Sequence, residues 1–199
     1  MFGERSLDDP ALGAARAAVE LLLAAHEPHP ALAVDRHWAM FAANRPVATL
    51  LDGVAHHLLA PPVNVLRLSL HPEGLAPRLL NYGEWRSHIL ERLRHQHRTT
   101  LDPALADLRA ELANYPPPPS GAESARAPDD PLPVVPLRLA SRHGDLSFLS
   151  TTTVFGTPLD VTLSEIAVES FFPSDAATAG VMRAIHDDRQ PPRDGPTER

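Results

Sequence analysis

Apolar residues follow helical spacing early in the chain, and strand-like segments occupy its last third. The first helix is predicted to begin at Pro10, a first-turn proline, directly after Asp8 and Asp9, which supply the N-cap. We expect this helix to end near His26, because the prolines at positions 28 and 30 cannot continue it.

Two short apolar runs flank residues 35–37, and this pattern predicts a tight β-hairpin. Asn44 is expected to cap a short helix that runs through Leu51, since Pro46 is tolerated in a first helical turn. A hairpin followed at once by a short helix is compatible with many folds.

Residues 54–114 are predicted to be helical throughout. Asn64 can start one helix, and the strongest amphipathic pattern covers residues 81–97. A further helix opens at Asp102 and ends at Tyr115. The predicted core face of the helix at residues 81–97 consists of Tyr82, Trp85, Ile89 and Leu93. That of the helix from Asp102 consists of Leu105, Leu108 and Leu112.

The C-terminal third is predicted to form three strands, at residues 134–139, 146–155 and 159–172. The apolar phase slips by one residue within the third strand, so we expect a β-bulge near Ser164 and Glu165. Ser174 or Asp175 is expected to cap a last helix that ends near Ile185.

These elements predict an α+β fold with a PAS-like antiparallel sheet, made of the N-terminal hairpin and the three C-terminal strands. Helices are expected to cover one face of the sheet, and neither group of strands should be stable alone. Residues 1–27 are assigned to a linker helix, residues 28–186 to the PAS-like domain and residues 187–199 to a disordered tail. Within the domain, the proline-rich residues 116–133 are expected to form a solvated loop.

Composition narrows the classes of function. The 199-residue chain has no cysteine, which excludes disulfides, cysteine-ligated metals and thiol nucleophiles. Its formal net charge of −7 argues against a nucleic-acid-binding surface. No stretch approaches the roughly 20 apolar residues of a membrane span, and the N-terminus lacks the pattern of a secretory signal. We therefore expect a cytoplasmic protein that does not contact a membrane.

Patterns for catalysis and metal binding are weak. One helix face collects Glu84, His88, Glu91 and His95. This face lies opposite the predicted core stripe, so we expect it to be solvated rather than to bind metal. The adjacent His56 and His57 could bind metal with help from elsewhere, but a boundary between core and surface is the favoured interpretation. No Gly-x-Ser-x-Gly elbow or phosphate-binding glycine loop occurs, so no enzyme activity, metal or cofactor is expected.

Large apolar residues are spread over both the sheet and the helices that should cover it. Most of them are expected to form core, but such a layer can also enclose an apolar pocket with polar groups at its mouth. The candidate ligand-binding residues are Trp38, Asn44, Arg67, Leu68, His71, Arg78, Trp85, Phe148 and Phe155. The polar members of this set could meet a ligand carboxylate, and Trp38, Leu68, Trp85 and Phe148 could contact its tail.

Several sequence motifs occur in a specific order. The stretch DRHWAMFAANR begins at Asp35, NVLRLSLHPEGL begins at Asn64 and NYGEWR begins at Asn81. LSFLSTTTVFGTPLD begins at Leu146, and ESFFP begins at Glu169. Each motif is weak alone, but their order over about residues 28–185 resembles the MmyB-like transcription-regulator ligand-binding domain.

The resemblance implies a PAS-like sensory domain of bacterial helix-turn-helix regulators, with an apolar, fatty-acid-like small molecule as its partner. Such regulators usually carry a DNA-binding domain before the sensory one, and residues 1–10 resemble the junction just after it. DNA contact is therefore expected only through a helix-turn-helix domain missing from this chain. Either the start codon is assigned too far downstream, or this is a free-standing sensory domain.

The predicted function is thus ligand sensing, with the ligand between sheet and helices and the first helix as the coupling element. Two alternatives remain open. One is a ligand-free module that forms homodimers or binds proteins through an exposed strand or the first helix. The other is a small hydrolase or isomerase that uses His71 with a nearby carboxylate.

Overall fold

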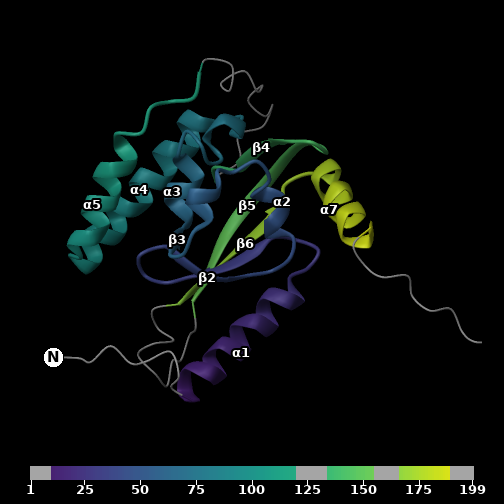
Figure 1. The fold of residues 1–199 in the computed structure, drawn as a ribbon, viewed down its shortest axis with the longest axis horizontal. Helices are drawn as coiled ribbons and strands as arrows, with labels where there is room; N and C mark the ends of the chain where they lie inside the picture. The colour runs from purple at the N-terminus through teal and green to yellow at the C-terminus, as the bar shows by residue number, and fades with distance from the viewer. Residues whose placement is uncertain (1–9, 120–133, 155–165, 189–199) are drawn as a thin grey trace, which may run out of the picture.

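The computed structural model describes residues 10–119, 134–154 and 166–188. Their strands form one six-stranded antiparallel sheet with the order β3-β2-β1-β6-β5-β4 (Figure 1). The strands are β1 (Ala31–Val34), β2 (Ala39–Ala43), β3 (Val63–Asn64), β4 (Leu137–Ser141), β5 (Gly144–Val154) and β6 (Ala167–Pro173). The predicted α+β fold with a PAS-like sheet is confirmed.

The helices begin and end close to the predicted positions. They are α1 (Pro10–Ala25), α2 (Val47–Leu50), α3 (Val65–Leu70), α4 (Tyr82–Thr100), α5 (Pro103–Ala113) and α7 (Ala176–Asp188), with the 3-10 helices η1 (His56–Leu59) and η2 (Ala76–Arg78). Asn64 caps α3 and Asp102 caps α5, since each side chain accepts hydrogen bonds from backbone N–H groups of the first turn. Asp175 caps α7, with its Oδ1 2.6 Å from the backbone nitrogen of Thr178.

The N-terminal hairpin and the C-terminal strands join through β1 and β6. These strands pair antiparallel, with Ala31 opposite Ser170 and Val34 opposite Ala167. This pairing confirms that the two strand groups share one sheet. The sheet also contains β3, which pairs with β2. Because β3 lies within residues 54–114, the prediction that this region is helical throughout is wrong at this strand. A strand of only two residues leaves no alternating pattern in a sequence.

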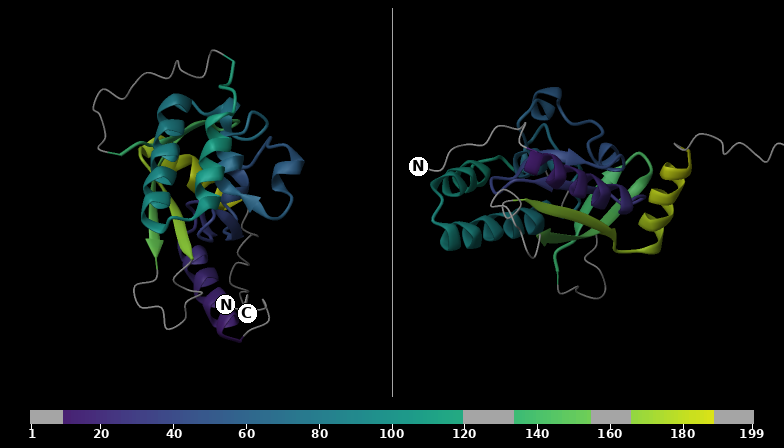
Figure 2. Two further views of the ribbon diagram at one scale, coloured as in Figure 1. Left: turned by 90° about the vertical axis from the view of Figure 1, so that its left-hand side faces the viewer. Right: turned by 90° about the horizontal axis from the view of Figure 1, so that it is seen from below.

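The sheet is covered on both faces rather than on one. The alternating residues Leu32 and Val34 of β1 belong to the larger core, which α3, α4 and α5 help to enclose. Ala31 and Ala33 face the other way and pack with Val19 of α1 in a smaller core. In the view from below, α1 lies in front of the sheet (Figure 2). Because all four β1 residues are buried, both faces of this strand need a cover. Helix α1 supplies the second cover, which corrects the predicted one-sided arrangement.

The predicted core faces of the two long helices are confirmed. Every residue assigned to them is buried: Tyr82, Trp85, Ile89 and Leu93 in α4, and Leu105, Leu108 and Leu112 in α5. The prediction for Asn44 is wrong, because α2 has no side-chain cap. The Asn44 amide instead accepts from the backbone N–H of Ala31 at 2.9 Å and donates to the carbonyls of Leu23 and His29 at 3.1 and 2.8 Å.

Some predictions fall outside the described residues. They include the N-cap at Asp8 and Asp9, residues 159–165 of the third predicted strand with its β-bulge, most of the proline-rich loop and residues 189–199 of the predicted tail. Helix α7 continues through Asp188, beyond its predicted end near Ile185. In the parts of the chain that the structure describes, no helix combines the length and apolarity that crossing a membrane requires.

Candidate functional site

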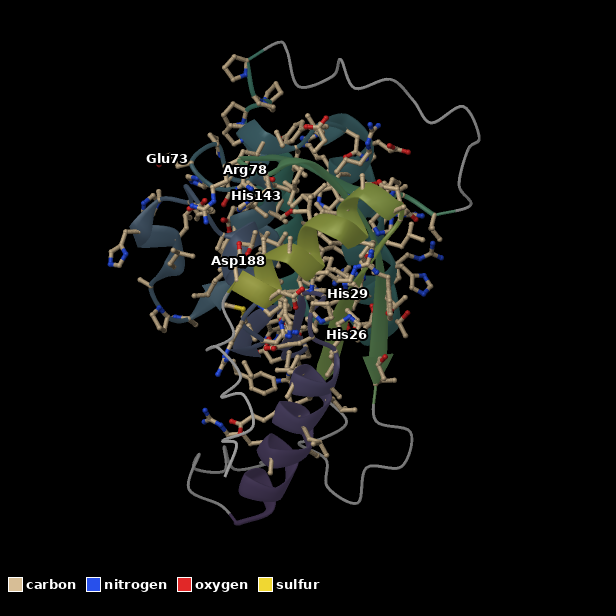
Figure 3. The ribbon with its side chains drawn as sticks, turned by 90° about the vertical axis from the view of Figure 1, so that its right-hand side faces the viewer. His26, His29, Glu73, Arg78, His143 and Asp188 are labelled. Carbon is tan, nitrogen blue, oxygen red and sulfur yellow. The ribbon has the colours of Figure 1, made fainter. Side chains whose placement is uncertain are left out.

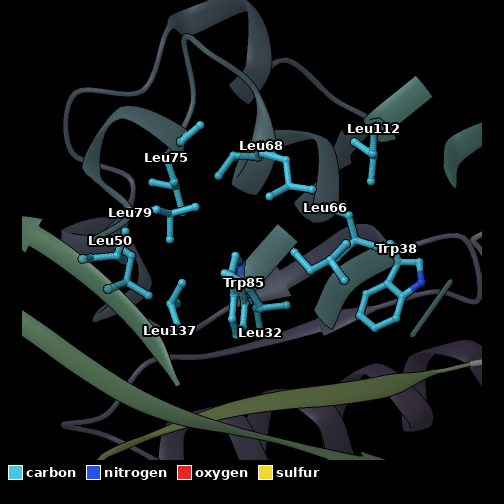
Figure 4. Packing of buried hydrophobic residues seen from close by; sticks show 14 of the residues in the cluster. Leu32, Trp38, Leu50, Leu66, Leu68, Leu75, Leu79, Trp85, Leu112 and Leu137 are labelled. Carbon is cyan, nitrogen blue, oxygen red and sulfur yellow. The ribbon is translucent and has the colours of Figure 1, made fainter. Parts of the chain in front are cut away.

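The larger core contains a cavity between the sheet and the helices. Its volume is about 80 Å³. Its apolar walls include Leu32 of β1, Trp38 of the β1–β2 turn, Leu66 and Leu68 of α3 and Trp85 of α4 (Figure 4). The polar residues that line it are Ser69, His88, Arg92, Ser150 and Glu169. The cavity is therefore apolar inside, with a small set of polar groups in its wall.

Trp38 is positioned by the turn between β1 and β2. Asp35 Oδ1 accepts hydrogen bonds from the backbone N–H groups of His37 and Ala39, both at 2.8 Å. This turn holds Trp38 at a φ of 69°, in the left-handed region that non-glycine residues rarely adopt. Trp38 Nε1 also donates to Gln96 Oε1 of α4 at 2.9 Å. The indole ring is thus fixed from both ends against the cavity.

Trp85 and Ser69 connect α4 to α3 within the cavity wall. Trp85 Nε1 donates to Ser69 Oγ at 2.9 Å, and both residues are buried. An indole N–H without a partner would be costly in this apolar surrounding. The hydrogen bond therefore fixes the ring orientation of Trp85 beside Leu68.

Arg92 and Glu169 form a largely buried ion pair in the cavity wall. Arg92 Nη2 lies 2.6 Å from Glu169 Oε1, and the side chains of Arg92 and Glu169 are 29% and 4% exposed. Thr152 Oγ1 donates to the same carboxylate oxygen at 2.6 Å and also contacts Arg92. The Arg92 guanidinium lies 4.3 Å from the centroid of the Trp38 ring, within cation–π range. Arg92 thereby ties α4 to two strands and to the turn that carries Trp38.

His88 is a third titratable residue in the cavity wall, beside Arg92 and Glu169. Its ring lies 5.5 Å from that of Trp85. Burial lowers the pKa of the His88 imidazole below its usual value, and the charge of Arg92 lowers this pKa further. The other members of its helix face, Glu84, Glu91 and His95, are exposed as predicted. His88 itself is only half-buried, and it lines both the cavity and the groove next to it.

A groove adjoins the cavity between α4 and β5. His88, Arg92 and Ser150 line both spaces, and the groove has a volume of about 550 Å³. Small-molecule sites in proteins typically occupy roughly 300–1,000 Å³. The cavity alone lies below this range, whereas the cavity and groove together lie within it.

Three of the predicted apolar site residues meet at this cavity. Trp38, Leu68 and Trp85 all line it. Phe148 is fully buried in the same core and packs at a ring distance of 6.5 Å against Phe171, which lines the cavity. Phe155 lies outside the described residues.

Arg67 and His71 lie away from the cavity. Arg67 forms a two-pronged ion pair with Glu111 of α5, at 2.7 Å for its closest contact. The His71 ring packs at 5.1 Å against Tyr115, whose hydroxyl donates to the same Glu111. Burial and this hydrogen bond raise the pKa of Tyr115 to about 12. These polar groups connect α3 to α5 and are not placed to meet a ligand in the cavity.

The side chains of Arg78 and Asn44 also lie outside the cavity and form hydrogen bonds with backbone groups. Arg78 donates to the backbone carbonyls of Leu50 and Ala140, each at 3.0 Å, and to that of Asp52. Asn44 links the end of α1 to β1 through the hydrogen bonds described above. Both side chains are committed to backbone partners, because polar groups near a core must be hydrogen-bonded there.

Sequence reasoning missed Arg92 and Glu169. Glu169 is the one charged residue in the strand Ala167–Pro173, and this was a signal that it needed a partner if the strand was buried. Nothing in the sequence identifies Arg92 as that partner, since the two residues lie far apart along the chain.

The chain matches a known family of ligand-binding domains. No curated protein matches the chain. The family described as "MmyB-like transcription regulator ligand binding domain" matches residues 15–185, which include every described residue that lines the cavity. Because this match extends over most of the chain, the protein belongs to the MmyB-like transcription regulator ligand-binding domain family.

Proposed function

We propose that the chain senses an apolar small molecule, which binds between the sheet and helix α4. The observation that carries this proposal is the apolar cavity beside a paired Arg92 and Glu169, in a domain of a ligand-binding family. The role is binding rather than catalysis, in the cytoplasm. Contact with DNA is then made through a helix-turn-helix domain and not by this domain.

The size of the cavity favours a ligand that also reaches the groove. An apolar cavity of about 150 Å³ holds benzene, and the cavity here measures about 80 Å³. A fatty-acid-like molecule fits this arrangement if its tail contacts Trp38, Leu68 and Trp85 while its other end lies in the groove. Because Arg92 is already paired with Glu169, a carboxylate at this point has to compete with Glu169 for the guanidinium.

Native mass spectrometry of the purified chain tests the proposal. We expect a one-to-one adduct, either carried from the expression host or formed with straight-chain saturated fatty acids. Leu68→Trp fills the cavity and should abolish the adduct, whereas Leu68→Met keeps the volume and should retain it. An adduct that survives Leu68→Trp contradicts the cavity assignment. Comparing each acid with the alcohol of equal length shows whether the carboxylate contributes.

Helix α1 is the proposed coupling element. It packs on the sheet face opposite the cavity, and the buried Asn44 amide joins its Leu23 carbonyl to Ala31 of β1. A ligand can act through α1 only if it binds two arrangements of this helix with different affinity. Amide exchange across residues 10–25 should therefore change when the ligand is added. Equal protection with and without ligand would refute the coupling.

Exposed residues on α1 favour a second candidate function, a homodimerisation module. Leu21 and Leu22 are neighbours on α1 and are 71% and 44% exposed, and adjoining exposed apolar side chains can mark an interface. Sedimentation at several concentrations tests this alternative. A concentration-dependent mass that Leu21→Glu abolishes supports the dimer, and a constant monomer mass excludes it.

A further inference from the structure

Three metal-ligating side chains from separate segments converge on the surface near the C-terminal end of α3. They are His57 of η1 and the residues His71 and Glu73 of the turn that follows α3. One ligand atom from each lies within 4.8 Å of the other two. Sequence reasoning considered His57 as a ligand only with help from elsewhere, and the fold brings that help to it.

Backbone hydrogen bonds hold the two segments in place. The backbone N–H of Ala55, next to η1, donates to the Glu73 carbonyl at 2.9 Å. The backbone N–H of Gly74 donates to the His71 carbonyl at 2.9 Å and closes the turn. A Cβ atom at Gly74 would lie 2.1 Å from the Leu68 carbonyl oxygen, so only glycine fits this turn. The backbone that carries the three ligands is therefore built before any ion binds.

The spacing of the side chains suits a tetrahedral ion. His57 Nε2 lies 3.8 Å from Glu73 Oε2. Two ligands at about 2.0–2.1 Å from a tetrahedral zinc ion lie about 3.3 Å apart. Small rotations of two exposed side chains close this difference. Two imidazoles and one carboxylate are also a donor set that zinc uses, with water in the fourth position.

We propose that His57, His71 and Glu73 bind a divalent transition-metal ion such as Zn²⁺. Bound there, the ion joins η1 to the end of α3, whose Leu66, Leu68 and Ser69 line the cavity. Coordination has a cost, because His71 Nδ1 accepts a hydrogen bond from the backbone N–H of Glu73 at 3.0 Å. Binding either replaces this bond or moves the ring proton, so we expect micromolar rather than nanomolar affinity.

Calorimetric titration of the full chain with Zn²⁺, after removal of any histidine tag, tests the proposal. We expect one ion per chain and at least about a tenfold weaker affinity in His57→Ala and in Glu73→Gln. His56→Ala is the matched control, because His56 is an exposed neighbour outside the group, and it should bind as the parent does. Glu73 lies at the molecular surface, apart from His26 and His29 (Figure 3), so its substitution should leave the core intact.

Thermal unfolding gives a second readout. Zn²⁺ at a hundred times its dissociation constant should raise the melting temperature of the parent by roughly 5–10 °C. At the same Zn²⁺ concentration the rise should fall to about half or less in His57→Ala, and it should stay at the parent's size in His56→Ala. The proposal is overturned if Zn²⁺ binding does not saturate near one ion per chain. It is equally overturned if His56→Ala loses as much affinity as His57→Ala.

Discussion

The ion pair between Arg92 and Glu169 leads to a quantitative prediction about stability. Replacing Arg92 by Met removes the guanidinium and leaves the Glu169 carboxylate with only the Thr152 hydroxyl as a side-chain partner among the described residues. The Glu169 side chain is 4% exposed, so water cannot replace the lost charge. Arg92→Met should therefore destabilise the fold strongly, while the near-isosteric Glu169→Gln should cost less.

The magnitudes follow from burial. Removing one partner of a buried pair typically costs about 3–5 kcal/mol. We take about 3 kcal/mol for Arg92→Met, because the Arg92 side chain is itself 29% exposed. Glu169→Gln should cost about 1–2 kcal/mol, since the freed guanidinium can turn toward solvent while Gln still accepts from Thr152. The double variant should cost no more than Arg92→Met alone, so the magnitude of the coupling energy should be at least the cost of Glu169→Gln, about 1–2 kcal/mol.

Urea denaturation of the four proteins at neutral pH measures this coupling. The midpoints should shift at a constant m-value, which shows that the variants keep the same cooperative fold. Free energies that add to within about 0.5 kcal/mol would refute the reasoning, because independent sites behave in that way. Arg94→Met provides a control, because Arg94 pairs with Glu91 only on the exposed face of α4, and this variant should leave the urea midpoint almost unchanged.

Three further predictions concern the rest of the fold. Burial lowers the pKa of both His26 and His29. As the pH falls below about 6.5, these residues therefore bind protons more readily in the unfolded chain than in the folded one, which destabilises the fold. Urea midpoints should therefore fall as the pH drops from 7.5 toward 5, and His29→Gln should flatten this decline. Asn44→Ala removes three hydrogen bonds of a buried amide and should cost about 2–3 kcal/mol, with faster amide exchange in α1. Ser69→Ala leaves the Trp85 N–H unpaired and should cost about 1–3 kcal/mol in thermal unfolding, and an unchanged melting temperature would contradict this role.

Much of the architecture was predictable because it depends on local rules. Asn64 and Asp102 predict where α3 and α5 begin, because a capping side chain accepts a hydrogen bond from a backbone N–H only two or three residues further on. The buried stripe of α4 follows from the spacing of its apolar residues. Trp38, Leu68 and Trp85 could be selected for the cavity because large apolar residues at the seam of two layers must meet there.

What the tertiary structure alone decided are contacts between residues far apart in the chain. The sequence contains Arg92, Glu169 and His88, but it does not state that α4 crosses β5 and β6 where these three meet. The residues around Asn44 predict a helix cap. Only the packing of α1 against β1 shows that its amide is instead buried between the Leu23 carbonyl and the Ala31 N–H. Local pattern specifies which face of an element is apolar, whereas the partner of each polar group depends on the packing of whole elements.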